Sequence, residues 1–276
     1  MDRGGNAKDY SHFFEDNVLG DIKRNGGSVE DYVAQESEYA FLFHFGKKGD
    51  WGERVLDFGG RIGEKTRKLQ NVTVAEVDAG ALRYMQDNGI GCINDIDSIG
   101  DGKASAIYCS HVLEHMEDPF STLKKFHAKL MAGGTVIMVL PAEVQTFEPS
   151  NNSVNELGHL QGWNLELLSD SLQRSGFTPI LKRFYWVPRL PMEIRIRKLF
   201  SGSKPLLSSF NNAKLSYFSF MYAVSGVAFF RYLLFSASYA KIHLINVLRF
   251  FKSAILRRPV RYATCMGEIL IVAVKK

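Results

Sequence analysis

Short apolar segments alternate with polar, amphipathic segments through the middle of the chain. The apolar segments read as strands over residues 54–58, 72–77, 91–95, 105–110 and 134–141, and the stretches between them have the polar faces and glycine stops of helices. The last of these strands, GTVIMVLP, is almost continuously apolar, as expected of a parallel strand buried on both faces. The pattern predicts a doubly wound α/β sheet.

Helical signals precede and follow these strands. Residues 10–48 read as partly amphipathic N-terminal helices. Asp118 and Pro119 have the residue types of a helix N-cap and first helical position, and predict a helix over PFSTLKKFHAKLM that is stopped by Gly133 and Gly134. Residues 178–186 read as a sixth strand.

The composition fits a folded protein. The chain has 276 residues, of which 46% are apolar, and this is enough for one large domain with an elaborated insert. Its three cysteines contain no C-x-x-C pair, which argues against a disulfide framework or a cysteine zinc site. The N-terminal residues show no secretory or lipidation signal, so we expect a cytoplasmic protein.

The positive charge is concentrated in one segment. Residues 189–261 hold thirteen Lys and Arg against one acid, Glu193, so that this segment carries +12 and the remainder −7. Residues 215–230 are uncharged but too few to span a membrane, whereas residues 239–258 have the pattern of a basic amphipathic helix. This pattern favours an anionic membrane surface over nucleic acid, with a helical cap or a homodimer contact as the alternative.

The first apolar strand ends in a glycine-rich turn, VLDFGGRIGE, which enters a helix at about Ile62. Such glycines allow a tight turn and the close approach of a ligand to the backbone. An acid that closes the next strand, either Glu76 or Asp78, is placed to bind the ribose hydroxyls of a nucleoside.

The stretch CSHVLEHMEDP contains His111, Glu114 and His115 at the H-x-x-E-H spacing that some zinc peptidases use. Those enzymes need both histidines on a sustained helix and a third ligand. Here residues 111–115 fall between a strand and the helix that starts at Pro119. We therefore expect a ligand-facing loop and no metal site.

These motifs resemble class I S-adenosylmethionine-dependent methyltransferases of the small methyltransferase-domain type, over about residues 54–186. The resemblance implies a Rossmann-like, seven-stranded sheet whose last strand, EILIVAVKK, inserts antiparallel between the fifth and sixth. It also implies S-adenosyl-L-methionine as cofactor. It implies that Asp57, Gly59, Gly60 and Gly63 contact the methionine portion of the cofactor and that Glu76 or Asp78 binds the ribose. It further implies that Asp95 and Ile96 contact the adenine, and that Ser110 and His111 line the sulfonium end.

Two residues depart from the family pattern. Arg61 stands where the family usually has glycine, so that the cofactor's carboxylate is expected to meet a guanidinium or to bind less tightly. Ser105 replaces an acid often found at the start of the fourth strand. Methyl transfer from a sulfonium needs mainly alignment, and a base only where the acceptor must lose a proton. The candidate bases are His111, His115 and His159.

The resulting prediction is a methyltransferase domain over residues 51–188 plus 262–276, with an N-terminal helical region, 1–50, and a basic helical insert, 189–261. Relatives of this kind often serve bacterial cell-envelope glycan pathways. We therefore expect O-methylation of a sugar or lipid-linked glycan by a cytoplasmic enzyme that is peripheral on the inner membrane face. The alternatives are methylation of a quinone or other apolar acceptor, and a catalytically silent cofactor-binding adaptor.

Overall fold

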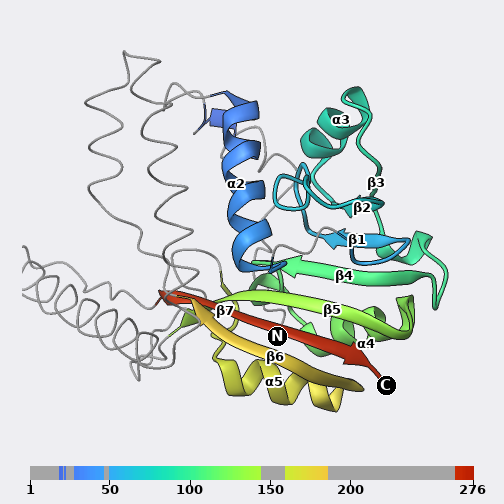
Figure 1. The fold of residues 1–276 in the computed structure, drawn as a ribbon, viewed down its shortest axis with the longest axis vertical. Coiled ribbons are helices and arrows are strands. Elements are labelled where there is room, and N and C mark those ends of the chain that lie inside the picture. The colour runs from blue at the N-terminus through green and yellow to red at the C-terminus, as the bar shows by residue number, and fades with distance from the viewer. Residues whose placement is uncertain (1–18, 21, 23–27, 47–49, 144–158, 186–264) are drawn as a thin grey trace, which may run out of the picture.

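A seven-stranded sheet dominates the computed structural model, which describes residues 19–20, 22, 28–46, 50–143, 159–185 and 265–276 (Figure 1). The strand order is β3-β2-β1-β4-β5-β7-β6. Strands β1 to β5 are parallel, and β7 runs antiparallel between β5 and β6. The strands are β1 (Val55–Phe58), β2 (Val72–Ala75), β3 (Cys92–Ile93), β4 (Ala104–Ser110), β5 (Leu130–Glu143), β6 (Phe177–Tyr185) and β7 (Cys265–Lys275).

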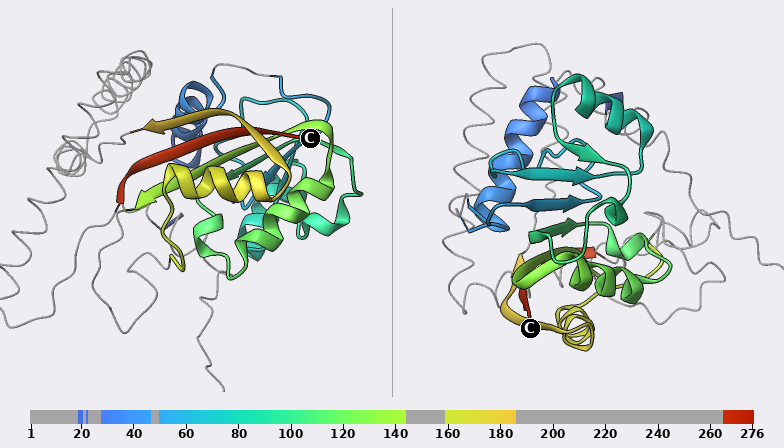
Figure 2. Two further views of the ribbon diagram at one scale, coloured as in Figure 1. Left: turned by 90° about the horizontal axis from the view of Figure 1, so that it is seen from below. Right: turned by 90° about the vertical axis from the view of Figure 1, so that its right-hand side faces the viewer.

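Helices cover both faces of this sheet (Figure 2). Helix α2 (Val29–Phe43) packs on one face through a cluster that includes Tyr108 of β4 and Ile137 of β5. Helices α4 (Pro119–Lys129) and α5 (Leu165–Arg174) pack on the other face against Ile107 and Met138. Successive strand residues point to opposite faces and both faces are covered, so the central strands are mainly apolar. Helix α3 (Ala79–Asp87) covers the sheet edge at β2 and β3.

The predicted Rossmann-like fold is confirmed, including the antiparallel last strand between β5 and β6. One boundary was wrong. The helix that starts at Pro119 ends at Lys129 and does not include Leu130 and Met131, because Leu130 already pairs with Ala104 of β4.

A second boundary was also wrong. The segment after the glycine turn was expected to be a helix from about Ile62, but residues 61–68 form turns. Left-handed backbone at Arg61 (φ 50°) and Gly63 (φ 69°) interrupts regular helical geometry there.

The basic segment 189–261 and the predicted helices within it lie outside the described residues, as do residues 144–158 of the long loop after β5. Within the part of the chain that the structure describes, no helix combines the length and apolar character that crossing a bilayer requires.

Candidate cofactor and acceptor site

The turn after β1 brings the backbone close to its neighbours. Gly59 has a left-handed φ of 68°, and a Cβ added there would lie 2.4 Å from Cγ2 of Val112. A Cβ at Gly60 would lie 2.3 Å from the carboxyl carbon of Asp57. Both positions therefore require glycine, and the turn exposes bare backbone at the carboxyl end of the sheet. This is the kind of surface that a nucleoside cofactor needs for close approach.

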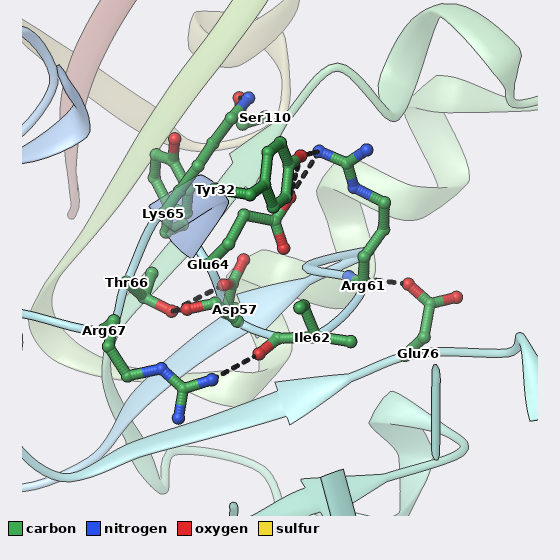
Figure 3. A network of polar contacts seen from close by, with 12 residues as sticks. Tyr32, Asp57, Arg61, Ile62, Glu64, Lys65, Thr66, Arg67, Glu76 and Ser110 are labelled. Carbon is green, nitrogen blue, oxygen red and sulfur yellow. Dashed lines mark hydrogen bonds and ion pairs between the residues drawn. The ribbon is translucent and has the colours of Figure 1, made fainter. Parts of the chain in front are cut away.

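Asp57 is the last but one residue of β1 and is buried at 1% exposure. Its Oδ2 accepts a hydrogen bond of 2.7 Å from Thr66 Oγ1 (Figure 3). Burial raises the pKa of Asp57 to about 7, although the bond from Thr66 acts in the opposite direction. The side chain therefore titrates near neutrality and is held at the floor of the site.

Glu76 directly follows β2, and its carboxylate is held by three backbone donors. Oε2 accepts from Arg61 N at 2.8 Å, while Oε1 accepts from Val77 N at 2.7 Å and from Asp78 N at 3.0 Å. A carboxylate offers about four lone-pair positions, so capacity for a ribose hydroxyl remains. The glycine turn and this carboxylate thus meet at one place, as the cofactor prediction requires.

The other predicted acids have local roles. Asp78 caps α3, with its side chain accepting from Ala81 N at 2.8 Å, so Glu76 is the better placed of the two ribose candidates. Asp95 caps the short 3-10 helix η2 (Ile96–Ser98) by accepting from Asp97 N at 2.9 Å. Ile96 is buried beside it at 5% exposure.

The guanidinium of Arg61 contacts other side chains of the protein. It forms an ion pair with the buried Glu64 and donates to Tyr32 Oη of α2 at 2.9 Å (Figure 3). These bonds direct the guanidinium away from Glu76, so Arg61 contributes only its backbone N–H to that carboxylate. The left-handed φ of 50° explains why the family usually has glycine here.

Lys65 supplies a cation that the sequence analysis did not identify. Its Nζ donates to Ser110 Oγ at 2.9 Å, at the carboxyl end of β4. Ser110 was predicted to line the sulfonium end of the cofactor, and Figure 3 shows Lys65 extending toward it. The lysine occurs in a turn with no distinguishing motif, so only the fold reveals this contact.

His111 follows β4 in a left-handed conformation, with φ 57°. Its Nε2 lies 2.8 Å from Glu268 Oε1 of β7, and its Nδ1 lies 3.5 Å from Glu114 Oε1. Although burial alone would lower the pKa of His111, these two carboxylates raise it above its usual value. An imidazole held between two carboxylates is better suited to hold those carboxylates in position than to accept a proton from an acceptor.

Glu268 is the centre of a polar network that the sequence analysis missed. Its Oε2 accepts from Tyr39 Oη at 2.6 Å and lies 3.3 Å from His44 Nε2. His44 Nδ1 in turn lies 2.7 Å from Tyr108 Oη. Although burial favours the neutral form of Glu268, its histidine partners hold its pKa well below the usual range. In sequence, Glu268 is only one acid at the start of an apolar strand.

The remaining predicted histidines lie together. Residues Leu113–His115 form the single 3-10 turn η3, which confirms the connection expected between β4 and α4. The rings of His115 and His159 pack edge to face with centroids 4.8 Å apart. His159 comes from the far side of the loop after β5, yet it meets η3 because Leu160 N donates to Glu114 O at 2.8 Å. The structure therefore brings His111, His115 and His159 to the same end of the sheet.

The family profile described as a methyltransferase domain matches residues 30–182. The chain belongs to this methyltransferase family. The match spans both halves of the site, from the turn after β1 to the histidines that follow β4. It confirms the predicted methyltransferase activity and the S-adenosyl-L-methionine cofactor that the sequence resemblance implied. The glycine turn and the positioned Glu76 are consistent with that cofactor.

Solved structures show the same methyltransferase fold at low identity. A candidate methyltransferase from Bacillus halodurans is 18% identical with a TM-score of 0.51, over 87% of this chain and 99% of that one. Phosphoethanolamine N-methyltransferase 2 from Haemonchus contortus, solved with S-adenosyl-L-methionine, is 14% identical with a TM-score of 0.52. The match covers 98% of this chain and 60% of that one.

The [4+2]-cyclase SpnF also shares the fold, at 14% identity and a TM-score of 0.51, over 88% of this chain and 80% of that one. No curated protein sequence matches this chain significantly. The fold alone therefore does not identify the acceptor, which must be argued from the site.

Proposed function

We propose that this methyltransferase transfers the methyl group of S-adenosyl-L-methionine to a hydroxyl group of a sugar or lipid-linked glycan. The observation that carries the oxygen acceptor is the convergence of His115 and His159 with the carboxylate of Glu114, beside which His111 is held by Glu268. A hydroxyl must lose its proton as it is methylated, so a site that is rich in basic groups suits it.

We assign the cofactor contacts as follows. Asp57, Gly59, Gly60 and Gly63 form the turn against the methionine portion, Glu76 accepts from the ribose hydroxyls, and Asp95 with Ile96 borders the adenine. We add Lys65 as the cation for the cofactor's carboxylate, since its Nζ already reaches Ser110. The bound cofactor supplies an activated methyl group, and the protein holds the acceptor oxygen in line with it.

The glycan is proposed on two grounds. The sequence resembles methyltransferases of bacterial envelope pathways, and the basic amphipathic pattern of residues 239–258 suits the anionic surface where lipid-linked sugars reside. A charge-reversed variant at Arg249, Lys252, Arg257 and Arg258 should bind anionic liposomes more weakly than the parent in a flotation assay. Equal flotation would remove the membrane-surface part of the proposal.

The acceptor is tested with methyl-labelled cofactor and separate lipid-linked glycan and quinone fractions. The proposal expects label that is stable to mild alkali and is recovered in a methylated monosaccharide after acid hydrolysis. Label in the quinone fraction would replace the glycan with the apolar acceptor considered from the sequence. Calorimetric binding of S-adenosyl-L-homocysteine without transfer to either fraction would instead favour the silent adaptor.

A further inference from the structure

The carboxylate of Glu114 is an unusual feature of the acceptor end of the site. The side chain is 0% exposed, and neither of its oxygens has a hydrogen-bond partner within the described residues. His111 Nδ1 lies 3.5 Å and His115 Nε2 lies 4.0 Å from Oε1. A buried carboxylate without hydrogen bonds is strongly unfavourable, so such a group calls for an ion, a water or a proton beside it.

The imidazoles of His115 and His159 lie near the carboxylate of Glu114. One ligand atom from each of Glu114, His115 and His159 can be chosen so that all three lie within 4.8 Å of one another. The donor atoms around a tetrahedral zinc ion lie about 3.4 Å apart, given bonds of about 2.1 Å. Small side-chain rotations therefore suffice to bring the three atoms onto one ion. The two segments are already tied together by the bond from Leu160 N to Glu114 O.

We propose that Glu114, His115 and His159 bind one divalent first-row transition-metal ion. Two imidazoles and one carboxylate favour Zn²⁺, whereas Mg²⁺ and Mn²⁺ are better suited to oxygen ligands and Mg²⁺ retains several waters. His115 keeps 24% of its side chain exposed, which leaves the site accessible from solvent. Three protein ligands leave a coordination position open, as in catalytic rather than structural metal sites.

Supporting contacts around these ligands suit the same assignment. His111 lies between Glu114 and Glu268, with 3.5 Å to the first and 2.8 Å to the second. Metal-binding carboxylates and histidines are commonly oriented by such partners. His111 is therefore a positioning residue for Glu114, and Glu268 connects the ion to the network of Tyr39 and His44.

A role for the ion in catalysis rests on the proposed hydroxyl acceptor. The open position would take the acceptor oxygen, and coordination lowers the pKa of a bound hydroxyl so that its proton passes to water. The oxygen then forms a bond to the methyl carbon while the carbon–sulfur bond breaks, and its electron pair stays on sulfur. The products are a methyl ether, a proton and S-adenosyl-L-homocysteine.

Metal binding by the untagged full-length protein tests the site directly. The chelator-treated protein is titrated with Co²⁺ and followed by visible absorption, and with Zn²⁺, Mn²⁺ and Mg²⁺ in parallel. We expect one Co²⁺ per chain with a ligand-field spectrum typical of a mixed nitrogen and oxygen site. The Glu114→Gln and His159→Asn variants should each lose at least about tenfold in affinity, because each lacks one of three ligands.

His127→Asn is the matched control, since His127 lies on α4 against Phe177 and outside the cluster. It should bind Co²⁺ as the parent does. If a buried variant fails to fold, the partly exposed His115→Asn provides the same comparison. Stoichiometric binding that none of the three variants weakens would overturn the proposal, as would no binding of Co²⁺, Zn²⁺ or Mn²⁺. In the latter case only water or a proton accompanies the carboxylate of Glu114.

Calorimetry with S-adenosyl-L-homocysteine on the metal-free protein separates this inference from the proposed function. Cofactor binding without metal binding would leave the methyltransferase assignment intact and remove the metal site. Metal binding without cofactor binding would leave the metal site intact and remove the methyltransferase assignment. The pair of measurements therefore shows which of the two proposals has failed.

Discussion

Replacing Asp57 with Asn tests whether the floor of the cofactor site carries a carboxyl group that is costly to ionise. Asp57 is 1% exposed, and its pKa is about 7 in the folded protein against an ordinary value of 3.8. The folded state therefore holds this proton more tightly than the unfolded chain does. The stability that the proton contributes is fully present below pH 3.8 and is lost as the pH rises toward 7.

The difference between these two pKa values corresponds to about 4 kcal/mol once Asp57 is fully ionised. Between pH 5 and pH 7 the parent should lose about 2 to 3 kcal/mol of unfolding free energy relative to Asp57→Asn, which cannot ionise. Above about pH 8 the difference between the two proteins should become constant.

Urea unfolding at pH 5, 6, 7 and 8 measures this difference directly. The exposed Asp87→Asn variant is the control, and its difference from the parent should stay nearly constant over the same range. A flat difference between the parent and Asp57→Asn from pH 5 to pH 8 would refute the reasoning. It would mean that the buried carboxyl has no raised pKa.

Three further substitutions test other parts of the site and core. Gly59→Ala should lower the free energy of unfolding more than Gly46→Ala, because both glycines have left-handed φ but an added Cβ meets a side chain only at Gly59. Calorimetry should also show about tenfold weaker cofactor binding by Gly59→Ala. Lys65→Met should weaken cofactor binding by at least about tenfold through loss of a charge-assisted hydrogen bond, and the exposed Lys124→Met should not. Phe126→Ala should cost about 3 to 5 kcal/mol in urea unfolding, because this ring is fully buried; a cost under about 1 kcal/mol would contradict its place in the core.

The sheet could be predicted because its signals are local. Strands such as β4 and β5 are buried on both faces and therefore appear as apolar runs, and Asp118 with Pro119 marks the start of α4 through capping chemistry. Element ends were harder to predict. The change from α4 to β5 at Leu130 depends on pairing with Ala104, which is distant in sequence.

The candidate site was partly predictable for the same reason. Gly59 and Glu76 follow strands at positions that the topology brings together, so a motif was enough to find them. Glu268 could not be found this way, because its meeting with His111 depends on the order of β5, β7 and β6. Likewise, only the structure reveals that Glu64 and Tyr32 hold the side chain of Arg61.

The place of β7 in the sheet brings Glu268 to the candidate site. Glu268 pairs with Pro141 of β5 and with Tyr185 of β6, and it is this register that points its side chain toward His111. A slip of one residue would turn Glu268 to the opposite face of the sheet. An insertion of one residue inside β7 would therefore disconnect this carboxylate from His111.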